Sequence, residues 1–107
     1  MPIYNKLVRD NILEIIKAEG LSYNARILTP DELLMEIKTK MIEEAHEFKE
    51  AVEKKEAVEE LADILELIHA SVGAYGVKLE ELEVIRKEKN EKRGGFEKAI
   101  YLIDVQD

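Results

Sequence analysis

Residues 40–68 read KMIEEAHEFKEAVEKKEAVEELADILELI, and this stretch decides the fold. It contains no proline, glycine or cysteine, and its apolar residues recur at three- and four-residue spacing, which is typical of amphipathic helix. A charged turn around residues 54–56 is expected to divide it into two helices. Because a short turn between two long helices makes them antiparallel neighbours, the stretch predicts a helical hairpin at the centre of the chain.

Local signals outward from this hairpin set the remaining helix boundaries. Thr29-Pro-Asp-Glu32 has the form of a capping box with proline at the first helical position, so the first hairpin helix should begin there. Gly20, Gly76 and Gly94-Gly95 follow apolar periodic segments and mark helix ends. The predicted helices therefore cover about residues 10–19, 29–54, 57–75 and 79–92.

Two segments outside these helices have the composition of short strands. Apolar and polar residues alternate from Tyr23 to Leu28, and the tail after Phe96 contains several β-branched and aliphatic residues. A short β pairing of residues 23–28 with the C-terminal tail is therefore expected. The predicted fold class is all-α, a four-helix bundle-like arrangement in a single domain over residues 1–107.

Composition limits the classes of function. The 107 residues carry a formal net charge of −8, which disfavours binding to a nucleic-acid polymer because such binding needs a basic surface. The chain has no cysteine, which excludes disulfides, thiolate metal sites and cysteine nucleophiles. No apolar run reaches the roughly 18 residues needed to span a membrane, so a cytoplasmic location without a membrane partner is expected. An acidic chain that handles phosphates must bind a cation or gather its few bases in one place.

Four acidic residues lie on or beside the apolar faces of the two hairpin helices. On a helical wheel, Glu44 and Glu60 fall inside the apolar arcs, and Glu47 and Asp63 lie at the edges of the same arcs. A buried carboxylate must be paired, protonated or bound to a metal. Neither apolar face carries a lysine or arginine. Either acidic pair alone is also common on a solvated helix surface, but two inward pairs across one hairpin favour a magnesium or manganese site.

These motifs resemble the MazG-like all-α nucleotide pyrophosphohydrolase superfamily, which includes phosphoribosyl-ATP pyrophosphohydrolase. Residues 40–47 (KMIEEAHE) and 59–65 (EELADIL) reproduce its E-x-x-E and E-x-x-D patterns. Residues 90–93 (NEKR) match a region that contacts phosphate or sugar, and residues 4–10 (YNKLVRD) resemble the start of a small house-cleaning branch. The resemblance implies magnesium-dependent hydrolysis of a nucleoside triphosphate, non-canonical ones included, to a monophosphate and pyrophosphate.

The acids and the resemblance together predict a site. One or two Mg²⁺ ions, or Mn²⁺ as a substitute, are expected on Glu44, Glu47, Glu60 and Asp63, with Glu44 and Glu47 as catalytic residues. Glu47 is also a candidate to orient or deprotonate the attacking water. The predicted substrate-binding residues are Lys6, Arg9, Lys89, Asn90 and Arg93. Basic residues at the ends of an acidic chain are also ordinary solvated side chains, and the base and sugar of the substrate stay open.

Two other classes of function are weighed against this hypothesis. Glu43-x-x-His46 and Glu66-x-x-His69 have the spacing of a carboxylate-bridged di-iron bundle, but three of the four residues fall outside the apolar arcs. A non-catalytic nucleotide-binding or helical oligomerisation module is the second alternative. The broad apolar surface of the second hairpin helix predicts a homodimer or homotetramer in every case.

Overall fold

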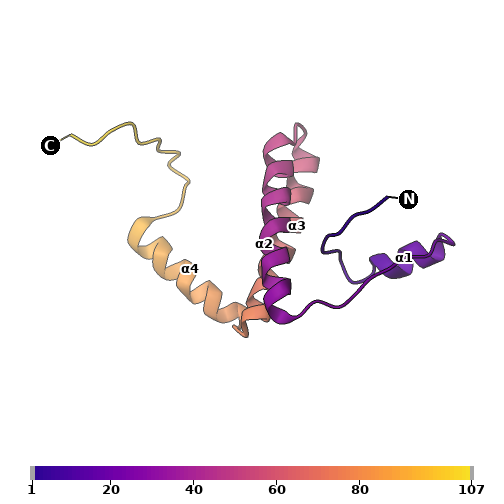
Figure 1. Cartoon of the computed structure of the whole chain (residues 1–107). Helices are drawn as coiled ribbons and strands as arrows, with labels where there is room; N and C mark the ends of the chain where they lie inside the picture. The colour runs from indigo at the N-terminus through magenta and orange to yellow at the C-terminus, as the bar shows by residue number, and fades with distance from the viewer. Residues whose placement is uncertain (1, 107) are drawn as a thin grey trace. The chain divides into compact units, whose positions relative to one another are not determined.

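The chain folds into four α-helices, and the computed structural model describes residues 2–106 (Figure 1). The helices are α1 (Ile12–Ala18), α2 (Pro30–Glu50), α3 (Lys54–Tyr75) and α4 (Leu79–Arg93). The predicted all-α class is therefore confirmed. The chain divides into two compact units, Met1–Gly76 with α1, α2 and α3, and Val77–Asp107 with α4.

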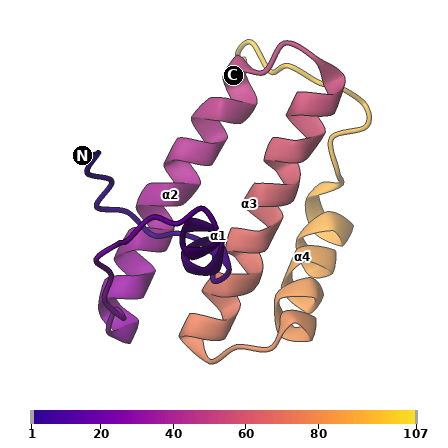
Figure 2. The same cartoon turned by 90° about the vertical axis from the view of Figure 1, so that its right-hand side faces the viewer.

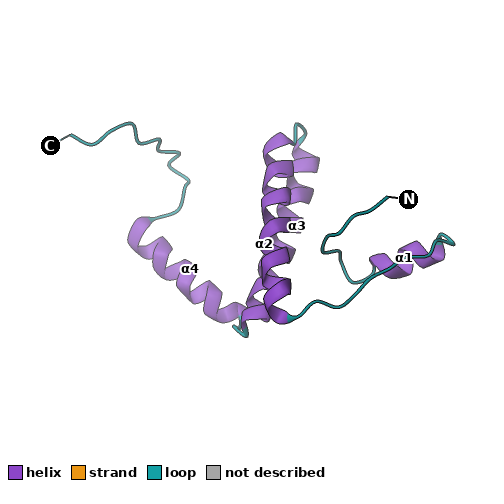
Figure 3. Cartoon of the chain, viewed as in Figure 1, coloured by secondary structure: helices purple, strands orange, loops and turns teal. Residues whose placement is uncertain are grey.

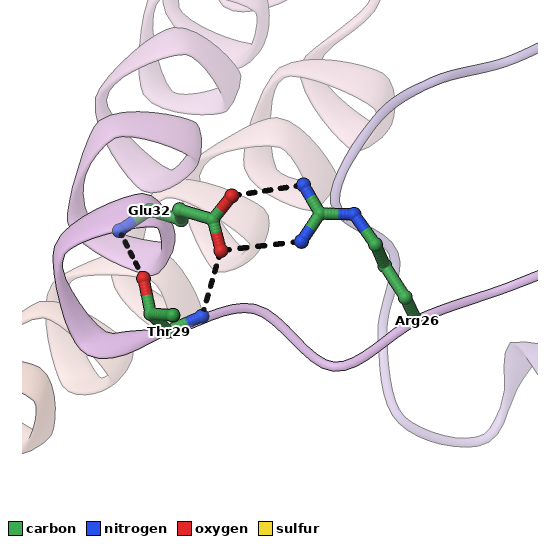
Figure 4. Close-up of polar contacts among 3 residues, drawn as sticks. All are labelled: Arg26, Thr29 and Glu32. Atoms are coloured by element: carbon green, nitrogen blue, oxygen red, sulfur yellow. Dashed lines mark hydrogen bonds and ion pairs between the residues drawn. The ribbon is translucent and has the colours of Figure 1, made fainter.

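The start of α2 is fixed by the predicted capping box (Figure 4). The Glu32 backbone N–H donates to the Thr29 hydroxyl at 3.3 Å, and the Thr29 N–H donates to the Glu32 carboxylate at 3.0 Å. Arg26 adds a two-pronged ion pair to the same carboxylate, at 3.2 and 2.9 Å. The Arg26 ion pair and the Thr29 N–H lower the pKa of Glu32 to about 2. The cap thus satisfies helix donors that α2 itself leaves free.

The turn of the hairpin lies earlier than predicted. Helix α2 ends at Glu50, and α3 already begins at Lys54, so the expected turn at residues 54–56 is wrong by about three residues. With only three residues between them, α2 and α3 run antiparallel and side by side (Figures 1 and 2). Helix α3 ends as predicted, at Gly76, whose φ of 71° suits glycine because it lacks a Cβ.

The hairpin buries little of its apolar surface. Among residues 2–106, Ile37 of α2 and Leu67 of α3 are the only buried hydrophobic side chains, at 1% and 8% exposure. By contrast, Phe48, Leu61 and Leu65 are between 41% and 54% exposed, although large apolar side chains normally lie inside a folded protein. The apolar arcs predicted from the sequence are therefore present, but much of their area stays uncovered in the chain alone.

The predicted β pairing is not found. No strand occurs in the described part of the chain, residues 2–106, where all segments outside the helices are loops and turns (Figure 3). Ile27 and Ile103, which lie in the two segments expected to pair, are 93% and 86% exposed. A two-stranded ribbon is marginal in water unless one face packs on something apolar, and these segments lack such cover. None of the described helices is both long enough and apolar enough to cross a membrane.

We expect Thr29→Ala to destabilise the protein by about 1 kcal/mol, because the N3 backbone N–H loses its acceptor. Such a loss corresponds to a fall in Tm of about 4 to 8 °C in thermal unfolding followed by circular dichroism. Thr39→Ala is the matched control, since Thr39 lies inside the same helix and donates its hydroxyl only to the Met35 carbonyl. Equal Tm values for the two variants would contradict the role of the cap.

Candidate metal centre

Three carboxylates from the two hairpin helices come together. Glu44 and Glu47 stand one turn apart on α2, and Glu60 stands near the start of α3. One oxygen from each of the three lies within 4.8 Å of the others. Glu44 is buried at 7% exposure, Glu60 is half-buried, and Glu47 is exposed. These are three of the four predicted metal ligands, and the predicted inward position of Glu44 agrees with its burial.

The group has two buried oxygens without a partner. Glu44 Oε2 and Glu60 Oε2 are shielded from solvent, and neither forms a hydrogen bond. Burial, together with the neighbouring Glu60 and Glu47 carboxyl groups, raises the pKa of Glu44 to about 8. A hydrogen bond from Glu44 lowers the pKa of Glu60, but burial and the nearby acids outweigh it, and the net direction is upward. Without a counter-charge, the group therefore retains a proton at neutral pH.

Asp63, the fourth predicted metal ligand, lies outside this group of three. Its Oδ1 accepts a hydrogen bond from Arg9 Nη2 at 2.6 Å, and Arg9 Nη1 lies 4.0 Å from a Glu66 oxygen. The side chain of Asp63 is 39% exposed. Asp63 is therefore held by an arginine from the N-terminal segment, a partner that the helical wheel could not reveal.

The N-terminal segment places a second base on the other helix of the hairpin. Lys6 Nζ lies 3.4 Å from a carboxylate oxygen of Glu43, the residue that precedes Glu44. The two predicted phosphate-binding bases of this segment therefore pair with acids of the hairpin, Lys6 with Glu43 on α2 and Arg9 with Asp63 on α3. Both bases were predicted as phosphate contacts, and their acidic partners were not foreseen. In the sequence, the one pattern that could have indicated a joint role for the two bases was their three-residue spacing within residues 4–10.

An open depression adjoins the carboxylate group at the hairpin turn. It has a volume of about 360 Å³, and its lining includes Glu47 and Glu60. The remaining lining residues are Glu50, Ala51 and Glu56. Four of the five lining side chains are acidic, so an anionic ligand can approach only with a cation between it and these carboxylates.

The other predicted substrate residues belong to the second unit. Lys89, Asn90 and Arg93 are exposed in the last turns of α4. Lys89 and Arg93 line a depression of about 450 Å³ along this helix, together with Ile85, Glu88, Glu91 and Lys92. Their role in substrate binding stays a prediction.

The residues of the di-iron alternative are not assembled. His46, Glu66 and His69 are exposed, and Glu43 pairs with Lys6. Within the described residues, the carboxylate group of Glu44, Glu47 and Glu60 is the one set with metal-ligand spacing, and it contains no histidine. An all-oxygen set suits hard cations such as magnesium, calcium and manganese rather than a histidine-carboxylate iron centre.

Comparison with protein-family models matches residues 6–90, most of the chain, to phosphoribosyl-ATP pyrophosphohydrolase. The matched range includes all of α1, α2 and α3 and therefore every member of the carboxylate group. Comparison with curated proteins finds no match, and comparison with solved structures finds none either.

We expect the metal-free protein to lose stability as the pH rises from about 4.5 to about 8. The folded pKa of Glu44, about 8, lies above its ordinary value of 4.5. The folded state therefore keeps a proton that the unfolded state releases, and this stabilisation is complete below pH 4.5 and gone above pH 8. Thermal unfolding in a chelator at several pH values measures the effect.

Two variants test whether this pH dependence of stability comes from Glu44 or from the other acids. Glu44→Gln should flatten the decline, because a glutamine side chain has no proton to lose in this range. Glu59→Gln, at an exposed position beside Glu60, should keep it. A wild-type Tm that stays constant or rises between pH 5 and pH 8 would show that Glu44 is not held protonated.

Proposed function

The chain belongs to the phosphoribosyl-ATP pyrophosphohydrolase family and is a pyrophosphohydrolase, and from this premise we propose that it cleaves nucleoside triphosphates with magnesium held between α2 and α3. The products are a nucleoside monophosphate and pyrophosphate. The observation that carries the proposal is the pair of buried, unpartnered oxygens on Glu44 and Glu60. Non-canonical nucleotides, removed in house-cleaning, are the proposed substrate class.

The donor set supports a hard divalent cation. All three grouped side chains offer carboxylate oxygens, and the proximity of their oxygens, within 4.8 Å of one another, is compatible with a shared ion. A cation there would give Glu44 Oε2 and Glu60 Oε2 the partner that they lack. It would also remove the need for a proton on Glu44, since a positive ion favours the charged carboxylate. Magnesium fits these oxygens, and manganese is the natural substitute.

The proposed reaction hydrolyses the α–β phosphoanhydride. When bound, a divalent cation neutralises the phosphate charge that repels an attacking water and fixes the phosphates in place. Glu47 is exposed at the rim of the group and lines the depression, so it is the proposed residue to orient the water and accept its proton. The water oxygen bonds to phosphorus, the bridging P–O bond breaks, and pyrophosphate leaves with the electron pair of that bond.

Basic residues are proposed to hold the phosphates that extend beyond the metal. Lys6 and Arg9 pair with Glu43 and Asp63 of the hairpin and are 43% and 54% exposed, so both are accessible to a ligand. Lys89, Asn90 and Arg93 of α4 are proposed to bind phosphate or sugar. The acidic lining of the depression explains why such bases are needed in addition to the metal.

We also propose that the active form is a homodimer or homotetramer, in which the four helices complete a bundle with those of another copy. The apolar faces of α2 and α3 leave Phe48, Leu61 and Leu65 substantially exposed. A second copy of the hairpin would cover these faces. Each Å² of apolar surface removed from water would stabilise the assembly by about 25 cal/mol.

Glu60→Gln should lower magnesium-dependent pyrophosphate release by about 100-fold or more. Each tenfold loss of rate corresponds to about 1.4 kcal/mol of transition-state stabilisation, and a metal supplies several kcal/mol. The measurement is pyrophosphate release from canonical and modified nucleoside triphosphates, with and without magnesium. Circular dichroism should show unchanged helix content.

Glu59→Gln is the matched control for charge, because Glu59 is exposed and neighbours Glu60 in the sequence. It should keep close to full activity. Full activity of Glu60→Gln, or equal losses in both variants, would exclude the proposed metal centre.

The proposed assembly predicts a particle of at least twice the 12.3 kDa of one chain in light scattering after size-exclusion chromatography. Leu65→Lys places a charge on the uncovered apolar face and should shift the protein toward monomer. Val84→Lys, at an equally exposed apolar position in α4, is the control. A monomeric wild-type protein at all concentrations tested would contradict the assembly.

A further inference from the structure

We propose that Arg9 competes with the divalent cation for Asp63, holding this carboxylate in the metal-free protein and releasing it when the cation binds. This inference rests on the metal centre of the proposed function. It makes the N-terminal segment with Lys6 and Arg9, here called the strap, a holder of Asp63 in the absence of metal and a source of a free base for the phosphates in its presence.

The position of Asp63 supports its recruitment. Asp63 follows Glu60 by three residues on α3, as Glu47 follows Glu44 on α2, and residues at this spacing are neighbours on one helix face. Three of these four acids already share a group within 4.8 Å. What distinguishes Asp63 is the 2.6 Å hydrogen bond from Arg9, which occupies its Oδ1.

The ion pairs of the strap are weak enough to be exchanged for other partners. Arg9 and Lys6 are each about half exposed, and exposed ion pairs contribute little free energy because water screens them. A divalent cation carries twice the charge of one guanidinium and can contact several carboxylates at once. The released Arg9 then stands beside the site, where the phosphates of a substrate offer it a stronger, bidentate partner.

Two single variants distinguish competition at Asp63 from a general change in charge. Arg9→Gln and Lys6→Gln each remove one positive charge near the carboxylate group, but only Arg9 holds a predicted ligand. The probe is Mn²⁺ without nucleotide, titrated into the full-length protein and followed by electron paramagnetic resonance or calorimetry. We expect Arg9→Gln to bind Mn²⁺ about three- to five-fold more tightly, the size of one exposed ion pair, and Lys6→Gln less than about two-fold.

A double-mutant cycle tests whether Asp63 transmits the effect. In an Asp63→Asn background, Arg9→Gln should no longer tighten Mn²⁺ binding, because the carboxylate that it would release is absent. Arg26→Gln is a further control, since Arg26 forms a comparable exposed ion pair with Glu32 at the start of α2. It should leave Mn²⁺ affinity unchanged.

The outcomes separate this inference from the proposed function. Mn²⁺ binding that is equal in wild type and Arg9→Gln overturns the competition and leaves the metal centre standing. Equal tightening by Lys6→Gln, or tightening that persists with Asp63→Asn, overturns it as well. If the wild type and Arg9→Gln both fail to bind Mn²⁺, the metal centre itself is wrong and the inference falls with it.

Discussion

Two carboxyl groups, Glu44 and Glu60, meet between α2 and α3 with no basic side chain from either helix to neutralise them. Their burial opposes ionisation, and the nearby Glu47 opposes it further, so the metal-free hairpin keeps a proton where a charge is normally found. Burying ionised groups without compensation costs several kcal/mol. The proposed cation would remove this cost, because a positive ion favours the charged carboxylates.

The N-terminal segment supplies basic side chains to this acidic hairpin. Lys6 and Arg9 bring two positive charges to an acidic surface and meet acids from both helices, Glu43 and Asp63. They lie against partners beside the buried pair and leave the innermost oxygens unpartnered. The exposed lysine and arginine therefore neutralise acids on the hairpin surface and not the buried carboxyl pair. The two innermost oxygens therefore stay available for the proposed cation, and the two bases for the proposed phosphates.

Those parts of the fold that depend on local chemistry could be predicted from the sequence. The Thr29 cap and the stop at Gly76 follow from hydrogen bonding and backbone freedom within a few residues, and both are confirmed. The turn between α2 and α3 could not be placed correctly. Residues 48–56 contain no proline or glycine, so their helical preference is nearly uniform and the packing of the two helices decides where the chain reverses. The β pairing failed for a related reason, since alternation shows strand preference but not whether a covering surface exists.

For the candidate site too, short-range features could be predicted from the sequence and long-range contacts could not. Helical periodicity predicted that Glu44 and Glu60 face inward, because the direction of a side chain from a helix depends only on residue number. It placed Asp63 at the margin of the same face but could not show that Arg9, 54 residues earlier, would reach it. Such long-range pairs depend on how a loop lies over a helix, which short-range patterns do not encode. The family match, over residues 6–90, includes both Arg9 and Asp63. Because an exposed ion pair contributes little free energy, the stability of the fold depends little on this contact, and its interest lies in the proposed role of Asp63 at the metal centre.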